Sequence, residues 1–318
     1  TSDSKHWEEI TRQSREAALS YIQNLSVKPF EDFMESLLRQ PKRAHSHQKT
    51  AWSADRQQLL RLRIRQMIEA KKNRWFPVLK PVPQGMFRLF CFPYAGAGAL
   101  SWREWQDSLQ DVAVVCPVQL PGRESRSGEE PFTNIQDLIR ALATQIEPLL
   151  NEPFLFFGHS MGAGIAFELT RELRRRGKPL PEILAISGAR APQLRTEIAP
   201  STSDENLIAH FQNLGGFQTP GPNQKDLIRQ ILPVLRADTE LYRKYIYKND
   251  TPLDLPILAY AGEQDINLSP ELIQDWSEQT TAEFQFSVLP GGHFFIRNPE
   301  FLQKLALDLR SITTLQNA

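Results

Sequence analysis

A serine bracketed by glycines carries the clearest chemical signal in the chain. Ser160 lies in the sequence Gly158-His159-Ser160-Met161-Gly162, after the apolar run 154–157 and before a segment with helical spacing. A G-x-S-x-G sequence between a buried strand and a helix is typical of a sharp turn that exposes the serine hydroxyl. The glycines leave room for such a turn because they carry no Cβ. The pattern predicts a nucleophile at Ser160; the alternative is an ordinary strand-to-helix turn.

A serine hydroxyl becomes a good nucleophile only when a base accepts its proton and a third group orients that base. Among the six histidines, His293 is best placed, because it follows an apolar run on the glycine-rich turn Pro290–Phe295. The alternative is an ordinary loop histidine. The other histidines fit less well: His6, His45 and His47 lie outside the sheet pattern, His210 lies in a predicted lid helix, and His159 should point away from the serine.

The orienting acid should lie between serine and histidine, in the chain order Ser, Asp or Glu, His. Asp265 comes just after the predicted strand 256–261, and Glu263 is the second choice. Asp254 precedes this strand and would not reach the same edge of the sheet. The alternative role for Asp265 is to cap the next helix, a role that suits Ser269 better.

The oxyanion of a tetrahedral intermediate needs backbone N–H donors that are already in place. We expect one from Met161, directly after the nucleophile, and one from the loop of small residues after the first strand. In this loop Ala95 is the first choice and Tyr94 the second. Gly96-Ala97-Gly98 lacks the third glycine of a dinucleotide-binding loop.

The scaffold that positions these residues is predicted by the pattern from residue 81 onward. Apolar strand-like runs alternate with segments of helical spacing, which favours an α/β fold: a mostly parallel central sheet with helices on both faces. Gly162 and Gly164 would let their helix pack closely on this sheet. The strand signal vanishes over about 195–249, where we expect a helical lid over the edge that binds ligands. The strands are expected at 87–92, 112–118, 154–157, 183–187, 256–261 and 284–288, and the helices at 100–109, 134–150, 162–176, 207–214, 227–247, 270–278 and 300–309.

Residues 1–80 form a separate basic segment. They hold 16 Lys and Arg against 9 Asp and Glu, although the whole chain is balanced at 37 of each. Apolar residues recur at three- and four-residue steps, which predicts helices. Pro81, Pro83 and Gly85 mark the boundary with residues 81–318. Two interpretations stay open: an amphipathic helix that lies on its own catalytic domain, or a basic surface that docks an acidic partner.

Several functional classes receive no support. A net charge of zero and a pI near 7.0 give no sign of nucleic-acid binding. No apolar run is long enough to span a membrane, and no secretory signal opens the chain. Cys91 and Cys116 lie in apolar runs, which predicts buried free thiols and a cytoplasmic location. His45 and His47 lack neighbouring metal ligands, so we expect no metal. The chain starts with Thr1 and not with an initiator Met, so the interpretation of the chain as a processed or excised piece of a longer protein stays open.

Four motifs occur in an order shared by a known family: Phe92–Gly98 (FPYAGAG), Leu120–Arg126 (LPGRESR), Gly158–Gly162 (GHSMG) and Gly291–Phe295 (GGHFF). Over about 86–310 the chain resembles the thioesterases of polyketide and nonribosomal peptide synthesis, particularly the type II (editing) kind. The resemblance implies an α/β-hydrolase that cleaves acyl thioesters from the phosphopantetheine arm of a carrier protein and has no cofactor of its own. It supports Ser160, Asp265 and His293 as the triad, Ala95 and Met161 as oxyanion donors, and 195–249 as a mobile lid.

The chain departs from this family in residues 1–80, about which the resemblance says nothing, and in an Ala-Gly-Ala-Gly loop where Ala-Gly-Gly is commoner. The added segment keeps open the alternative of a terminal releasing domain of a megasynthase, which offloads its product by hydrolysis or macrocyclisation. A general carboxylesterase fits the motifs less well, and a non-catalytic binding protein on this fold is a further alternative. The expected partner is an acyl or peptidyl carrier protein or a synthase subunit, docked on residues 1–80.

Overall fold

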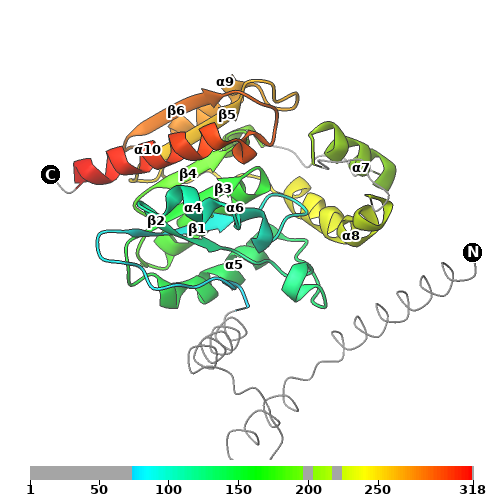
Figure 1. Cartoon of the computed structure of the whole chain (residues 1–318), viewed down its shortest axis with the longest axis horizontal. Coiled ribbons are helices and arrows are strands. Elements are labelled where there is room, and N and C mark those ends of the chain that lie inside the picture. The colour runs from blue at the N-terminus through cyan, green and yellow to red at the C-terminus, as the bar shows by residue number, and fades with distance from the viewer. Residues whose placement is uncertain (1–73, 196–202, 217–223, 317–318) are drawn as a thin grey trace, which may run out of the picture. The chain divides into compact units, whose positions relative to one another are not determined.

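Six parallel strands form the sheet that carries the predicted functional residues. The computed structural model describes residues 74–195, 203–216 and 224–316, and the predictions for 1–73 lie outside this part of the chain. Within it the strand order is β2-β1-β3-β4-β5-β6, and each neighbouring pair is parallel (Figure 1). The strands are β1 (Phe87–Phe92), β2 (Ala113–Pro117), β3 (Phe154–His159), β4 (Leu184–Ser187), β5 (Ile257–Gly262) and β6 (Phe284–Leu289).

Helices cover both faces of this sheet, as the alternating pattern predicts. The helices α5 (Ile135–Ile146) and α6 (Met161–Arg175) pack on one face, and α4 (Trp105–Leu109) and α10 (Pro299–Gln316) pack on the other. The short helix α9 (Pro270–Gln274) follows β5 and contributes Ile273 to the cluster on the same face as α5 and α6. Because both faces are covered, the central strands are mostly apolar and do not alternate with polar residues. Arg88 of β1 is a buried exception, and it pairs with Glu152.

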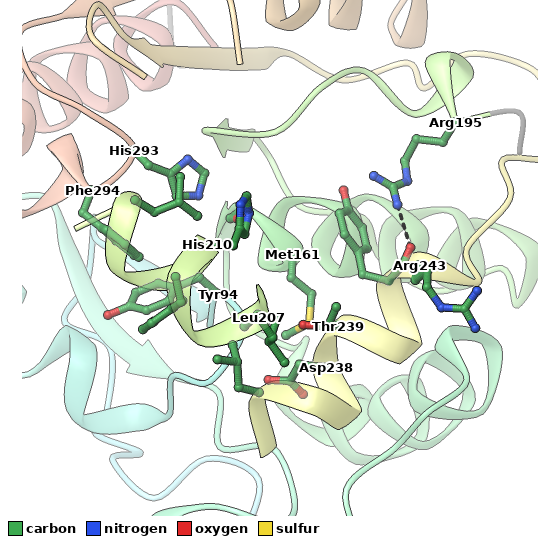
Figure 2. A pocket seen from close by; sticks show the side chains of 16 residues that line it. Tyr94, Met161, Arg195, Leu207, His210, Asp238, Thr239, Arg243, His293 and Phe294 are labelled. Atoms are coloured by element: carbon green, nitrogen blue, oxygen red, sulfur yellow. Dashed lines mark hydrogen bonds between the residues drawn. The ribbon is translucent and has the colours of Figure 1, made fainter. Parts of the chain in front are cut away.

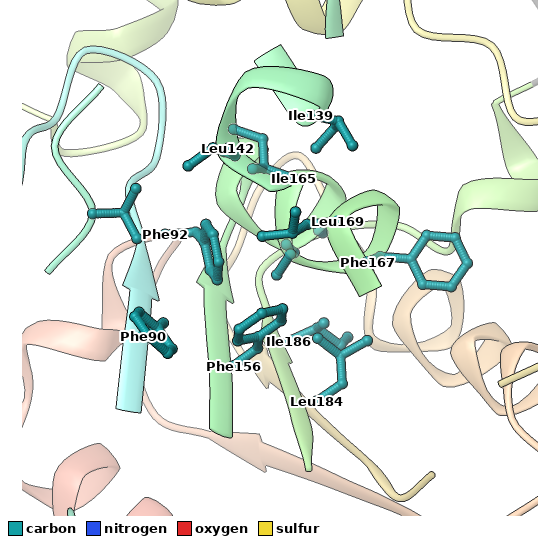
Figure 3. Close-up of a cluster of buried hydrophobic side chains, with 14 of the residues drawn as sticks. Phe90, Phe92, Ile139, Leu142, Phe156, Ile165, Phe167, Leu169, Leu184 and Ile186 are labelled. Carbon is teal, nitrogen blue, oxygen red and sulfur yellow. The ribbon is translucent and has the colours of Figure 1, made fainter. Parts of the chain in front are cut away.

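The side-chain alternation of the strands divides the interior into two clusters. Phe90 and Phe92 of β1 point toward α5 and α6, whereas Leu89 and Cys91 point toward α4 and α10. Figure 3 shows the first cluster, in which Phe156 of β3 lies beside the β1 rings; its ring centroid is 5.0 Å from that of Phe92. This packing fixes β1 and β3 against one another.

Three predicted helices are divided in the structure, and the one at 134–150 becomes α5 followed by the 3₁₀ turn Glu147–Leu149. In place of one helix at 100–109 there is a 3₁₀ turn, Ala99–Trp102, followed by α4. The backbone N–H of Ala99 donates to the side chain of Gln119 and that of Leu100 donates to Glu124, so contacts with a distant loop set the first turn. The prediction at 270–278 is divided in the same way into α9 and the 3₁₀ turn Asp275–Gln279. Further 3₁₀ turns are Glu124–Arg126, Pro192–Leu194 and Phe295–Arg297.

The predicted lid consists of two helices in its described part. These are α7 (Asp204–Asn213) and α8 (Gln224–Arg243), which lie together at one side of the domain in Figure 1. Residues 196–202 and 217–223 of the predicted lid lie outside the described part. Trp75 and Phe76 are buried in the same hydrophobic cluster as α5, so these two residues of the predicted extension pack as part of the sheet domain.

Candidate active site

The predicted nucleophile and the predicted oxyanion loop leave the sheet side by side. From β1 the chain crosses to β2 on one side and then returns to β3 on the other, so β1 and β3 flank the point where the strand order reverses. Phe92 at the end of β1 is paired with Gly158 near the end of β3. Parallel α/β sheets bind ligands outside the carboxyl ends of the strands at this point. The loop that starts at Pro93 and the turn at Ser160 therefore share one site.

Ser160 occupies a strained turn between β3 and α6. Its φ of 54° and ψ of −118° are unusual for a residue with a side chain, and its N–H donates to the carbonyl of Ser187 at 2.8 Å. Such a conformation costs about 1–3 kcal/mol and persists only where the surroundings impose it. The strain supports the prediction of a nucleophile at this turn.

The glycines of the motif are needed for space. A Cβ on Gly158 would lie 2.2 Å from the carbonyl oxygen of Gly162, and a Cβ on Gly162 would lie 2.2 Å from that of Phe92. Gly162 therefore lets α6 approach the sheet, as expected. The expectation for Gly164 is wrong, because its Cβ would meet the ring of Tyr242 on α8 at 2.8 Å. Gly164 makes room for the lid helix and not for the sheet.

His293 and Asp265 form a hydrogen-bonded pair. The Nδ1 atom of His293 lies 2.6 Å from Oδ2 of Asp265, and both side chains are buried. The other carboxylate oxygen of Asp265 accepts from the N–H of Asn267 at 3.0 Å, which fixes the acid in its loop after β5. Glu263, the alternative acid, is exposed and bonds to Gln264. The pair is thus the one favoured by the order of residues in the chain.

His159 has a contact that the sequence analysis missed. Its ring is fully buried and its centroid lies 4.9 Å from that of His293, while its Nδ1 shares a hydrogen bond of 3.1 Å with Oγ of Ser187. Burial lowers the pKa of His159 well below its usual range, and the neighbouring His293 and Arg297 lower it further. We infer that His159 stays neutral and packs against the predicted base. Gly188 leaves space for its ring, since a Cβ there would lie 2.6 Å from Cε1 of His159.

The predicted oxyanion loop is a tight turn. The N–H of Ala97 donates to the carbonyl of Tyr94 at 3.0 Å, and Gly96 has a φ of +77°, which suits glycine at the third position of such a turn. The N–H of Ala95, at the second position, takes no part in this hydrogen bond. Met161 is the first residue of α6, where N–H groups have no partner inside the helix. Both predicted donors are therefore suitably placed in their elements.

The predicted nucleophile, base and oxyanion donors line a common cavity of about 260 Å³. Ser160, Met161, Ala95 and His293 line it from the sheet side, and residues of α7 and α8 line it from the other side. Figure 2 shows His293 and Phe294 at one end of the cavity and Arg195 and Arg243 at the other, with Met161 between them. The side chain of Arg195 donates to the carbonyl of Tyr242. His210, which we did not favour as a base, lies on the lid side of this cavity.

Comparison with known proteins identifies the family. The family model of the thioesterase domain matches residues 87–311. The chain belongs to the thioesterase family. Gramicidin S biosynthesis protein GrsT of Aneurinibacillus migulanus is 38% identical over 231 residues, which cover 72% of this chain and 90% of GrsT. The thioesterase is also similar to the solved structure of RedJ, a thioesterase of the prodiginine pathway in Streptomyces coelicolor. The two are 36% identical with a TM-score of 0.66, and the match covers 76% of this chain and 99% of RedJ. BorB, a type II thioesterase from the borrelidin cluster, is 32% identical with a TM-score of 0.67. The match covers 74% of this chain and 97% of BorB.

These matches confirm the predicted family, the α/β-hydrolase fold and an enzyme that hydrolyses thioesters. They cover the catalytic domain of the thioesterase, so the role of residues 1–80 stays a prediction. Within residues 74–195, 203–216 and 224–316, no group of three or more His, Cys, Asp or Glu side chains could hold a metal ion. In the same part of the thioesterase, no helix has both the length and the apolar character that crossing a membrane requires.

Proposed function

We propose that this thioesterase hydrolyses acyl groups from the phosphopantetheine arm of an acyl or peptidyl carrier protein in polyketide or nonribosomal peptide synthesis. Ser160 is the nucleophile, His293 the base, Asp265 the residue that orients it, and Met161 and Ala95 the oxyanion donors. The observation that carries this proposal is the meeting, in one cavity, of a strained serine turn and a buried His293–Asp265 pair. The names of GrsT, RedJ and BorB, which belong to such biosynthetic pathways, support the choice of substrate.

The reaction follows from these positions. Asp265 accepts a hydrogen bond from Nδ1–H of His293, which leaves Nε2 as the basic nitrogen. Oγ of Ser160 attacks the thioester carbonyl carbon as Nε2 takes its proton, and the N–H groups of Met161 and Ala95 hold the negative oxygen. The C–S bond then breaks and the proton passes to the leaving thiolate. A water molecule, deprotonated by His293, attacks the acyl-serine ester and releases the carboxylic acid and the free serine.

We propose water, and not the distal end of the substrate, as the acceptor, because the chain is similar to BorB, a type II thioesterase.

We further propose that the thioesterase needs no cofactor of its own and works in the cytoplasm, where its two free cysteines stay reduced. The carrier protein docks on the basic residues 1–80. Raising the salt concentration should then reduce turnover of an acyl-carrier substrate more than turnover of a small acyl thioester, because salt screens attraction between exposed charges. Equal salt effects on both substrates would exclude this docking role.

Intact-mass analysis with a panel of acyl-carrier proteins tests the activity. We expect the carrier to lose the mass of its acyl group, the released product to be the linear acid, and Ser160→Ala to lower the rate by about 10⁶-fold. A cyclic product would show that an internal nucleophile of the substrate, and not water, releases the acyl group. Full activity of Ser160→Ala would refute the mechanism.

A further inference from the structure

A buried ion pair links the lid helix α8 to the loop that follows β2. The guanidinium of Arg123 donates from Nη1 to Oδ2 of Asp238 at 2.6 Å and from Nη2 to Oδ1 at 2.7 Å. The side chains of Arg123 and Asp238 are only 5% and 2% exposed. Burying two charges is costly unless each is fully hydrogen-bonded, so the remaining partners of this pair show what it holds in place.

Nε of Arg123 donates to the carbonyl of Pro121 in its own loop at 3.2 Å, and the other partners belong to the backbone of the predicted oxyanion turn. Oδ2 of Asp238 accepts from the N–H of Gly96 at 2.8 Å, and Nη1 of Arg123 also donates to the carbonyl of Ala97 at 2.9 Å. A Cβ on Gly96 would lie 3.4 Å from Leu235, one turn before Asp238, so α8 packs directly against the turn. Side chains from two other segments thus hold the central Ala95–Gly96 peptide of the turn and the Ala97–Gly98 peptide that follows it.

The N–H of Ala95 belongs to the Tyr94–Ala95 peptide, whose carbonyl accepts from Ala97 within the turn. The next peptide, Ala95–Gly96, is held from outside the turn by Asp238, so the orientation of the Ala95 N–H depends on both bonds. We infer that Asp238 and Arg123 are positioning residues that aim the Ala95 N–H at the oxyanion, and that the oxyanion site is complete only when α8 is seated. This inference rests on the proposed function, because it assigns to Ala95 the role of a donor.

The competing explanation is that the ion pair merely anchors the lid. Two double variants separate the explanations. In Arg123→Met/Asp238→Leu, both charges are removed together and Gly96 loses its acceptor. In Arg123→Met/Asp238→Asn, the amide oxygen can still accept from Gly96. Replacing both members of a buried ion pair by apolar groups is often neutral for stability, so the Leu variant should fold. The Asn variant also leaves no unpaired buried charge, so it should fold as well.

The assay measures kcat and KM on a small acyl thioester, with the unfolding temperature as a check of folding. We expect the Leu variant to lose about 10- to 100-fold in kcat, the scale of a donor displaced by about 1 Å, with KM little changed. The Asn variant should recover most of this loss. Arg236→Met, which removes an exposed ion pair with Asp204 between the two lid helices, is the matched control and should keep the wild-type kcat.

Equal kcat values in the two double variants, or a loss confined to KM, would overturn the positioning role and leave the lid anchor. If the Leu variant does not fold, Asp238→Glu replaces it: this variant keeps the charge but moves the acceptor by one methylene, so kcat should fall at constant KM. An unchanged kcat in Asp238→Glu would also overturn the inference. If the wild type shows no turnover, the proposed function itself is refuted. If the wild type is active but the two double variants have the same kcat, only the positioning role is refuted.

Discussion

Replacing Gly162 by alanine should disable the site through the backbone alone. The added Cβ would lie 2.2 Å from the carbonyl oxygen of Phe92, 2.7 Å from its carbonyl carbon and 2.9 Å from the carbonyl oxygen of Pro93. Ordinary contact begins at about 3.4 Å, so α6 and the end of β1 must separate by about 1.2 Å. Since all three neighbours are backbone atoms, no side-chain rotation relieves the clash.

The displacement acts on both proposed oxyanion donors at once. Met161 directly precedes Gly162, and Phe92 and Pro93 lead into the turn that presents Ala95. A misplacement of about 1 Å costs about 10²-fold in rate, and complete loss of one donor costs about 10²–10³-fold. We therefore expect Gly162→Ala to lower kcat by at least about 10²-fold.

Stability should change much less. Overpacking costs about 1–3 kcal/mol, and alanine regains about 1 kcal/mol in a helix, so the net loss is at most about 2 kcal/mol. In a domain of this size the unfolding temperature then falls by less than about 8 °C. Thioester turnover and thermal unfolding of the same preparation measure both effects.

Gly128→Ala is the matched control, because nothing lies within 4 Å of a Cβ at that position and its φ is not positive. It should leave kcat and unfolding temperature unchanged. A Gly162→Ala variant whose kcat stays within about threefold of wild type would refute the argument that the distance between α6 and β1 sets the oxyanion site.

Three further outcomes are expected. Asp265→Asn should lower kcat by about 10⁴-fold in the thioester assay with little change in folding, because His293 loses the acceptor that fixes its tautomer; a loss below tenfold would contradict this. His159 stays neutral in the folded protein but protonates near pH 6.5 when unfolded, so acid favours unfolding. The variant His159→Gln removes this group. Below pH 6.5, the unfolding free energy of the variant should therefore depend less steeply on pH, by about 1.4 kcal/mol per pH unit. Denaturant titration measures this slope, and an unchanged slope would refute a neutral His159. Burial raises the pKa of Cys91, and that of Cys116 to about 12, so neither thiol should react with a disulfide reagent before unfolding; rapid reaction of the native protein would contradict their burial.

Much of the site could be predicted from the sequence because parallel strands impose a simple rule. Their carboxyl ends meet at one edge, so residues that directly follow strands come together however far apart they are in the chain. Ser160, Asp265 and His293 each follow an apolar run, and the structure brings the first and third to one cavity and the second into contact with the third. The order of strands in space was not needed for this prediction.

The parts that could not be predicted depend on contacts between side chains far apart in the sequence. Asp238 is 115 residues from Arg123, and nothing in the helical spacing of the lid distinguishes it from a solvent-facing carboxylate. Arg123 was part of a recognised motif, but its partner was unknown. The division of the helix at 100–109 arises in the same way, from side chains of Gln119 and Glu124 that bond its first N–H groups.

The site therefore has a fixed part and a part that depends on the lid. Ser160 and Met161 are held between β3 and α6, and Asp265 and His293 follow β5 and β6, so the sheet sets their positions. The turn of Ala95 is instead held by Asp238 of α8. If the lid helix moved away, the proposed nucleophile and base would keep their geometry, while Ala95, one of the proposed oxyanion donors, would lose its support. Acyl transfer to Ser160 would then be fast only when a substrate lies under a seated lid, which protects thioesters that merely touch the open site.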